Sequence, residues 1–308
     1  MIEKYYSGVI EQIYNRIGKE TRNIVMANYS NDFSIENLEV IRRYQSNEDN
    51  VFFAYSEFSY NTLVGAYEPF LDIICNMHRR FIGGSFDDFQ KECGVYYLHR
   101  QVLNSYYETG ECFREETVLL NEVAYEQRRM TMAIADMLKK LSEVKPLMIV
   151  INRFQMASKS SIETIKYLID NPCANIGIVL GVNAIVKGAD STVEVWDRIV
   201  ESLEDRSAIY YIGSAGPLKN NIKTTNDDEL YITMNFEQSI QEASNIMEFL
   251  DYEQARRGCR IIEHKIKFEN AWIDEKSLRR FYLVYARTSV LLGEMSKAIE
   301  LMNEYKAL

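Results

Sequence analysis

The chain has 308 residues, of which 47% are hydrophobic and 26% are charged, and its formal net charge is −10. That composition is typical of a folded protein of one large domain or two ordinary ones, and it excludes disorder as the main state. The negative charge repels nucleic-acid phosphates, and because the sequence contains no basic run we expect no direct nucleic-acid partner.

Neither a membrane segment nor a disulfide framework is expected. No stretch approaches the ~20 apolar residues that cross a bilayer, and the N-terminus lacks the apolar core of a signal peptide, which predicts a cytoplasmic protein. The cysteines are odd in number and show no CxxC spacing, so we expect buried, reduced thiols and no zinc ribbon. They are Cys75, Cys93, Cys112, Cys173 and Cys259.

The first 60 residues predict the beginning of a parallel sheet. Apolar side chains at three- and four-residue steps predict a helix over 4–18, and "NIVMA" (23–27) predicts a buried strand that ends in a polar loop. A helix over 33–44 and a second strand over 50–58 follow. Strand, loop, helix and strand in this order favour a right-handed crossover.

The middle of the chain continues this alternation. A helix is predicted over 60–82, with a kink or break at Pro69, and another over 117–142, while the tyrosine-rich region 90–116 supports no assignment. Strands are then predicted over 147–152, 176–182 and 208–212, and helices over 160–170 and 192–203. This rhythm is typical of an α/β domain with a mostly parallel sheet.

The strand signals stop near residue 235, and four amphipathic helices with short connections follow. The polar stretch "KNNIKTTNDDE" (219–229) lies at the change. We therefore expect an α/β domain over residues 1–225 and a helical domain over residues 235–308.

One strand and the helix after it carry a family resemblance. The segment "KPLMIVINRFQMASKSSIETIKYLIDN" (145–171) resembles the Walker B segment of the STAND-type ATPases, large regulators related to AAA proteins and found among LuxR-family activators. In that family the strand ends in two acids that hold magnesium and orient water. Their positions fall on Asn152 and Arg153, and a later aspartate falls on Ser158. The resemblance thus implies an ATPase scaffold without its acids.

The same resemblance implies a phosphate-binding loop of the form GxxxxGK[ST] after the first strand. The matching residues 27–34 are "ANYSNDFS", in which the two glycines fall on Ala27 and Asp32, the lysine on Phe33 and the hydroxyl residue on Ser34. Glycines let the backbone N–H groups of such a loop wrap the phosphates, and the lysine neutralises them. Because Asp32 adds a negative charge and Phe33 removes the cation, we expect tight ATP binding in the usual pose to be disfavoured.

Weaker similarities agree with this alignment over residues 20–220. "AYEPFLDII" (66–74) is similar to a Tyr-x-Pro-Phe helix of the family, and "YYIGSAGPL" (210–218) resembles the segment that leaves the sheet. "IGIVLGVNAI" (176–185) resembles the fourth strand, after which an arginine often senses the phosphate. Asn183 and Ala184 occupy that neighbourhood here.

The C-terminal helices resemble tetratricopeptide repeats. The segment "FYLVYARTSVLLGEMSKAIELMNEYKAL" (281–308) has an aromatic residue, a small residue, a turn glycine and a second small residue at the repeat's spacing, namely Tyr282, Ala286, Gly293 and Ala298. Ala243 and Ala255 match a weaker earlier copy. Repeat-like helical hairpins are the favoured interpretation, and a plain helical bundle is the alternative.

Other residues that could carry chemistry have ordinary explanations. His78, His99 and His264 lack metal-ligand spacing, so we expect no metal site. Adjacent acids in polar loops or on solvated helix faces are commoner than catalytic pairs, which applies to Asp87–Asp88, Glu115–Glu116 and Asp227–Asp228. Ser158 begins a helix without a nucleophile motif, which indicates an N-cap, with Ser160 as a second candidate. We therefore assign no catalytic residue.

Three hypotheses for the function follow. The first is a non-catalytic pseudo-ATPase without a cofactor, a protein-interaction or regulatory scaffold that binds partners through its C-terminal helices and forms homo- or hetero-oligomers. The 21 tyrosines and 14 phenylalanines favour such an interaction protein. The second is an ATP- and magnesium-binding STAND-type switch with divergent motifs, or with a site completed by a partner subunit. The third is an unrelated α/β enzyme.

Overall fold

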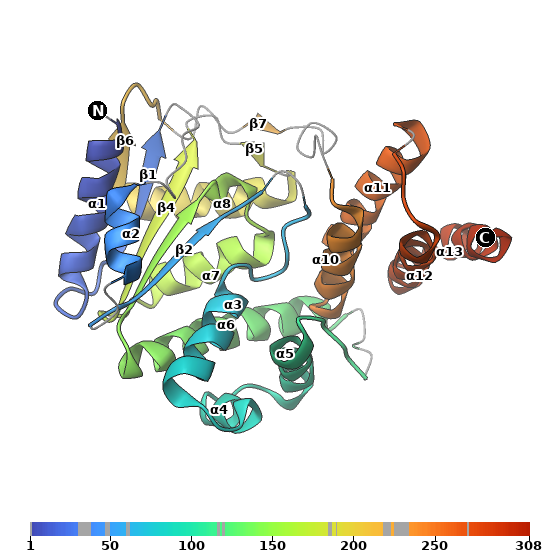
Figure 1. The fold of residues 1–308 in the computed structure, drawn as a ribbon, viewed down its shortest axis with the longest axis horizontal. Coiled ribbons are helices and arrows are strands. Elements are labelled where there is room, and N and C mark those ends of the chain that lie inside the picture. Colours follow the sequence, from blue (N-terminus) through green and yellow to red (C-terminus); the bar gives the residue numbers. More distant parts are fainter. Residues whose placement is uncertain are drawn as a thin grey trace. The chain divides into compact units, whose positions relative to one another are not determined.

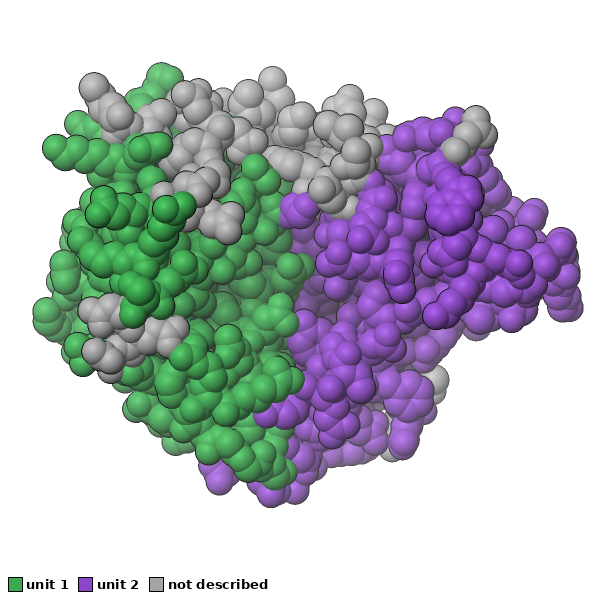
Figure 2. All heavy atoms as spheres, viewed as in Figure 1, with its two compact units in different colours: residues 1–58, 67–86, 131–225 green, residues 59–66, 87–130, 226–308 purple. Residues whose placement is uncertain are grey.

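The structure is a computed structural model that describes residues 2–29, 38–46, 50–59, 62–115, 118, 121–183, 187–188, 190–217, 223–224, 234–269 and 271–308. The chain forms two compact units (Figure 2). Unit 1 contains residues 1–58, 67–86 and 131–225, and unit 2 contains residues 59–66, 87–130 and 226–308. Segments 59–66 and 87–130, which the sequence analysis placed in the N-terminal domain, thus group with the C-terminal helices.

Unit 1 is built on a sheet of five parallel strands in the order β2-β3-β4-β1-β6 (Figure 1). The strands are β1 (Ile24–Tyr29), β2 (Phe52–Glu57), β3 (Leu147–Asn152), β4 (Ile176–Asn183) and β6 (Ile209–Ile212). Each of them overlaps a strand that the sequence predicts, so the α/β fold with a parallel sheet is confirmed. A two-residue pair, β5 (Lys187–Gly188) and β7 (Lys223–Thr224), forms a separate parallel ladder.

Helices cover both faces of this sheet. Helices α1 (Ile2–Arg16) and α2 (Glu39–Ser46) lie on one face, and α7 (Lys159–Asp170) and α8 (Asp190–Glu204) lie on the other (Figure 1). The chain crosses from β1 to β2 in one direction and from β3 through β4 to β6 in the opposite direction, so right-handed crossovers place the two helix pairs on opposite faces. All six residues of β3 are buried, which explains its uninterrupted apolar run.

The helix predicted over 60–82 is correct only in its second half. Helix α3 (Phe70–Met77) continues into a π-helical turn (His78–Ile82), whereas residues 66–69 form a turn. Proline restricts the residue before it to extended conformations and has no N–H for a helical hydrogen bond, so the helix starts after Pro69.

Among its described residues, unit 2 contains helices and their connections but no strand. Helix α4 (Phe86–Glu92) lies mostly before the unassigned region 90–116, and α5 (Tyr97–Thr109) lies within it. Helix α6 (Val123–Val144) follows, and its residues up to 130 belong to unit 2. The four predicted C-terminal helices are α10 (Phe236–Glu248), α11 (Tyr252–Phe268), α12 (Glu275–Leu291) and α13 (Met295–Ala307). Gly293 has a φ of 77° in the turn between α12 and α13, a left-handed conformation that glycine adopts without strain. The all-α character of this region is confirmed.

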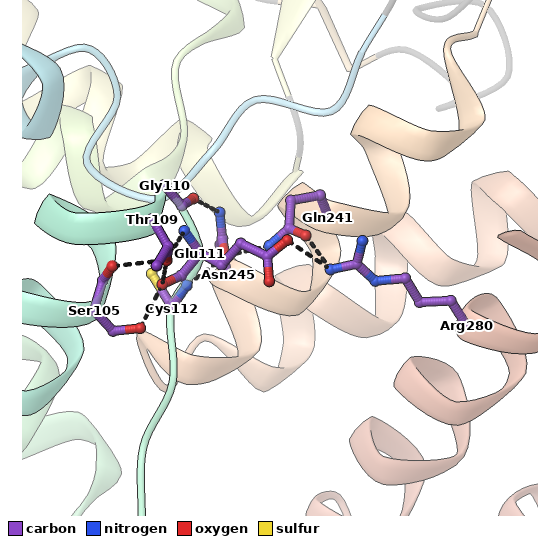
Figure 3. Close-up of polar contacts among 8 residues, drawn as sticks. All are labelled: Ser105, Thr109, Gly110, Glu111, Cys112, Gln241, Asn245 and Arg280. Carbon is purple, nitrogen blue, oxygen red and sulfur yellow. Dashed lines mark hydrogen bonds and ion pairs between the residues drawn. The ribbon is translucent and has the colours of Figure 1, made fainter.

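A group of polar contacts ties the loop after α5 to the C-terminal helices (Figure 3). The buried side chain of Asn245 on α10 accepts a hydrogen bond from the backbone N–H of Cys112 (2.9 Å) and donates one to the carbonyl of Gly110 (3.3 Å). The amide of Gln241 also donates to Asn245 Oδ1 at 2.9 Å. The guanidinium of Arg280 on α12 lies 3.5 Å from the Glu111 carboxylate. These bonds explain why 87–130 belongs to this unit.

Candidate functional site

The carboxyl ends of the parallel strands bring most of the described site positions together in unit 1. In the β1–β4 ladder, Tyr29 lies opposite Asn183, and in the β2–β3 ladder Glu57 lies opposite Asn152. Ligands of open α/β sheets bind at this edge, where neighbouring strands send their connections to opposite faces. The switch occurs here between β1 and β4, so this edge is the candidate site.

Asn152, the position of the first family acid, is completely buried at the end of β3. Its Oδ1 accepts a hydrogen bond of 2.6 Å from the hydroxyl of Tyr29 and another of 2.9 Å from the backbone N–H of Arg153. An amide oxygen has two lone pairs, and both are used in this way. Asn152 is thus held as an internal structural group and offers no free oxygen to a metal ion.

Arg153, the position of the second acid, pairs with a carboxylate of the neighbouring strand. Its Nη2 lies 3.2 Å from Oε1 of Glu57, and Nη1 lies 3.5 Å from the carbonyl oxygen of Phe58. The other Glu57 oxygen accepts a 2.6 Å hydrogen bond from the hydroxyl of Tyr55. Because both oxygens of Glu57 are engaged and a fixed cation stands beside them, the geometry opposes magnesium, which needs free oxygen ligands.

The backbone of Arg153 is strained. Its φ is 54° and its ψ is 38°, in the left-handed region that costs a non-glycine residue about 1–2 kcal/mol. The left-handed residue leads directly into the turn Phe154–Met156, and Phe154 packs there against the ring of Trp196 at 5.5 Å between centroids. Buried packing of Phe154 therefore holds the strained turn that aims the guanidinium at Glu57.

The first strand extends further than the sequence predicts. Ala27, the position of the first loop glycine, lies inside β1 and pairs with Gly181 and Tyr210, so the loop does not begin there. Asn28 and Tyr29 continue the ladder although their side chains are polar, because Asn28 Nδ2 donates to the carbonyl of Gly216 at 2.8 Å and Tyr29 bonds to Asn152. The other loop positions, Asp32, Phe33 and Ser34, lie outside the described residues.

Asn183 is the last residue of β4 and lies at the same edge of the sheet. Its backbone N–H donates a 3.4 Å hydrogen bond to Oε1 of Gln155, a residue in the turn after β3. Asn183 therefore lies at the same sheet edge as Asn152, while Ala184 lies outside the described residues. Two buried polar atoms at the ends of β1 and β3, Oδ1 of Asn28 and Nδ2 of Asn152, have no hydrogen-bond partner among the described atoms.

Sequence reasoning missed Tyr29, Glu57 and Gln155. Tyr29 and Glu57 are the last residues of two strands, and their position at the carboxyl end was the available signal. Gln155 gave no signal, since its contact with Asn183 depends on the turn geometry after β3.

The histidines and acid pairs have structural roles where they are described. His78 is buried against the ring of Phe86, with centroids 5.0 Å apart. Burial lowers the pKa of His99 to about 3, so this side chain is neutral at pH 7 beside the Glu126 carboxylate 3.0 Å away. The hydrogen bond from Lys91 lowers the pKa of the Asp87 carboxyl. Glu116 and the Asp227–Asp228 pair lie outside the described residues.

The predicted N-cap of α7 is confirmed. The hydroxyl of Ser158 accepts a 3.3 Å hydrogen bond from the backbone N–H of Ser161. Ser160 has a different role, since its hydroxyl accepts a hydrogen bond from the backbone N–H of Tyr67 at 3.0 Å. These serines stabilise the start of the helix after β3 and its contact with the turn before α3.

The described part of the chain contains neither a metal-binding cluster nor a membrane-spanning helix. No group of three or more His, Cys, Asp or Glu side chains there is arranged to hold a metal ion. None of the helices in the same part combines the length and the apolar character needed to span a membrane. Burial raises the pKa of the Cys75 thiol to about 12, which makes it unreactive at pH 7.

Comparison with known proteins does not assign the chain to a family. No model of a known protein family matches the sequence, and no curated protein matches it at a significant level.

Proposed function

We propose that the chain is a degenerate STAND-type ATPase fold that does not hydrolyse ATP and acts as a protein-interaction or regulatory scaffold. The observation that carries the proposal is the end of β3, where an amide and a guanidinium stand at the two positions of the family's acids. Both are held by hydrogen bonds or ion pairs within the protein, to Tyr29 and to Glu57. Because Arg153 already neutralises the charge of Glu57, no magnesium ion is required to balance it. This supports a structural role for the end of β3.

The surface of unit 2 supports the interaction part of the proposal. Large apolar side chains are exposed at the end of α11, in the connection that follows and along α12 and α13, namely Phe268, Trp272, Leu283, Val290, Met295 and Ile299. Trp272 is 84% exposed, and Leu283 and Val290 are seven residues apart and so share one face of α12. Large apolar side chains exposed on neighbouring helices are a feature of many protein-binding surfaces.

ATP binding tests the first part of the proposal. Calorimetry with ATP and Mg²⁺ should show no saturable heat, because the carboxylate of Glu57 is already paired and the phosphate-loop pattern is lost. Micromolar binding would instead support an ATP-binding switch with divergent motifs, which is the competing function. The observation in favour of that alternative is that Nδ2 of Asn152 and Oδ1 of Asn28 have no hydrogen-bond partner among the described atoms.

A double substitution tests the loss of hydrolysis. We expect Asn152→Asp with Arg153→Asp to show no ATP turnover, because the acids would return without the glycines and lysine of a phosphate loop. Phosphate release from ATP is the measurement, and a melting curve checks that the variant folds. Turnover in the double variant would show that residues 27–34 bind phosphate after all and would contradict the alignment.

The binding surface is tested separately. Affinity purification from the native cells should recover a partner with the wild-type chain and lose it with Trp272→Ser combined with Ile299→Ser. Tyr125→Ser is the matched control, since Tyr125 is also exposed in unit 2 but lies on α6. A partner retained by the double variant and lost by the control would contradict the assignment of the surface to α11–α13.

A further inference from the structure

The strand β2 forms one edge of the unit 1 sheet, and one of its sides has no strand partner among the described residues (Figure 1). The backbone N–H of Phe52 donates to the carbonyl of Pro146 at 2.7 Å, and that of Phe58 donates to the carbonyl of Asn152 at 3.3 Å. Main-chain groups alternate between the two sides of a strand. Even-numbered residues of β2 therefore face β3, and the main-chain groups of Phe53 and Glu57 face the open side.

A groove runs along this open side. It has a volume of about 420 Å³, which falls within the ~300–1,000 Å³ of ordinary ligand pockets. Its floor is formed by residues 52–56 of β2, one wall by Asp72, Ile73 and Asn76 of α3, and the other wall includes Gln45 of α2. Residues of α2, β2 and α3 therefore line the groove together.

The described strand β2 lacks three features that often protect a sheet edge, namely a proline, a lysine and a bulge. Its sequence, "FFAYSE", contains no proline and no lysine, and the register with β3 runs without a bulge from Phe52 to Glu57. The charge of Glu57 is bound by Arg153. Natural edge strands are often blocked by such features, so a strand that lacks them and lines a groove is suited to receive another strand.

We propose that this groove binds an extended, uncharged segment of a protein partner, which adds to the sheet as a sixth strand beside β2. Peptides that bind in this way gain affinity from main-chain hydrogen bonds. Asp72 and Arg80 give the lining one charge of each sign, so a charged side chain gains little there. The site is separate from the surface of α11–α13.

The test uses a fluorescein-labelled peptide of alternating threonine and valine, of the same length as β2, and the full chain. Fluorescence anisotropy should show saturable binding to the wild type. Asn76→Trp, which fills the groove from its α3 wall, should weaken binding by about tenfold or more, equivalent to ~1.4 kcal/mol. Lys140→Trp, on the exposed surface of α6, should leave the affinity unchanged. Melting curves establish that both variants are folded.

A second peptide separates main-chain from side-chain recognition. Methylation of alternate backbone nitrogens on the side that faces β2 removes the main-chain donors without changing the side chains, and this peptide should not bind. The proposal is overturned if the unmodified peptide does not bind, if the methylated peptide binds equally well, or if Asn76→Trp has no effect. Sedimentation showing a dimer that Asn76→Trp abolishes would also overturn it, in favour of self-pairing.

Discussion

At the scale of single residues, the hydroxyl of Tyr29 occupies an oxygen of Asn152 that a magnesium site would need to keep free. It is buried and donates a 2.6 Å hydrogen bond to the amide of Asn152, and its ring packs edge-on against that of Tyr6 at 6.2 Å. Hydrogen bonding of this amide by the protein itself fixes the end of β3. The side chain therefore acts as a link between β1 and β3, which are not neighbours in the sheet.

We expect Tyr29→Phe to lower the free energy of unfolding by about 1–2 kcal/mol, because it removes one buried hydrogen bond and leaves Asn152 Oδ1 with a single donor. Urea denaturation measures the change. Tyr210→Phe is the matched control, since the Tyr210 hydroxyl bonds to Gln12 at the exposed surface and its loss should change stability little. Equal effects of the two substitutions would show that the bond to Asn152 contributes nothing specific.

We expect His99 in unit 2 to make the free energy of unfolding depend on pH. Burial, followed by the charges of Arg114 and Arg129, lowers its pKa to about 3, whereas an unfolded histidine titrates near ~6.5. Below pH 6.5 the unfolded chain takes up a proton that the folded protein does not, so stability falls as the pH decreases from 6.5 toward 3. The slope approaches ~1.4 kcal/mol per pH unit.

The measurement is urea denaturation of the wild type and His99→Gln between pH 7 and pH 4. The free energy of unfolding of the wild type should fall more steeply with acid than that of the variant. Parallel curves for the wild type and His99→Gln would mean that folding does not change the pKa of His99. A shallower fall for the wild type would mean that the Glu126 carboxylate, 3.0 Å away, keeps His99 protonated in the folded protein.

At the scale of elements, local pattern identified the strands but not their ends or their neighbours. β3 and β4 are continuous apolar runs because both faces of the sheet are covered, and a run of that kind is visible in one segment. The end of β1 was missed because Asn28 and Tyr29 look like loop residues until their partners, Gly216 and Asn152, are known. Those partners lie far away in the sequence, and the local periodicity of a segment does not reveal contacts with distant residues.

The candidate site was predictable in position but not in contacts. The alignment placed Asn152 and Arg153 at the end of a strand, and the structure has them there. The pairing of Arg153 with Glu57 depends on β2 and β3 being adjacent, which neither segment reveals alone. Likewise, α5 was not assigned, since the tyrosine-rich region 90–116 gave no clear helical period.

Asn245 gives an element-scale prediction, because it joins α10 to the loop after α5 (Figure 3). Asn245→Ala removes the bonds to Cys112, Gly110 and Gln241, and we expect it to lower the free energy of unfolding by about 1–3 kcal/mol. Glu237→Ala on the exposed side of α10 is the control, with an expected change within ~0.5 kcal/mol. A smaller loss for Asn245→Ala than for the control would show that the loop is held by other contacts.

At the scale of the whole molecule, the two units do not coincide with the two domains that the sequence predicts on either side of residue 225. Unit 2 joins α10–α13 with residues 87–130, so a fragment of residues 1–225 would carry half of that unit without its other half. Within unit 2, the buried guanidinium of Arg114 donates to the carbonyl of Glu248, and the side chain of Gln127 donates to the carbonyl of Leu250. Both bonds are lost in such a fragment.

Limited trypsin digestion tests this consequence of the division. In the full chain Arg114 is 5% exposed and should be cut slowly, whereas in the 1–225 fragment it loses the carbonyl of Glu248 and should become an early cleavage site. Mass spectrometry of the peptides identifies the cuts, and cleavage after Lys140, which belongs to unit 1, serves as the internal reference. If Arg114 is cut at the same rate relative to Lys140 in both proteins, residues 87–130 fold without α10–α13, and the boundary near residue 225 separates two independent domains.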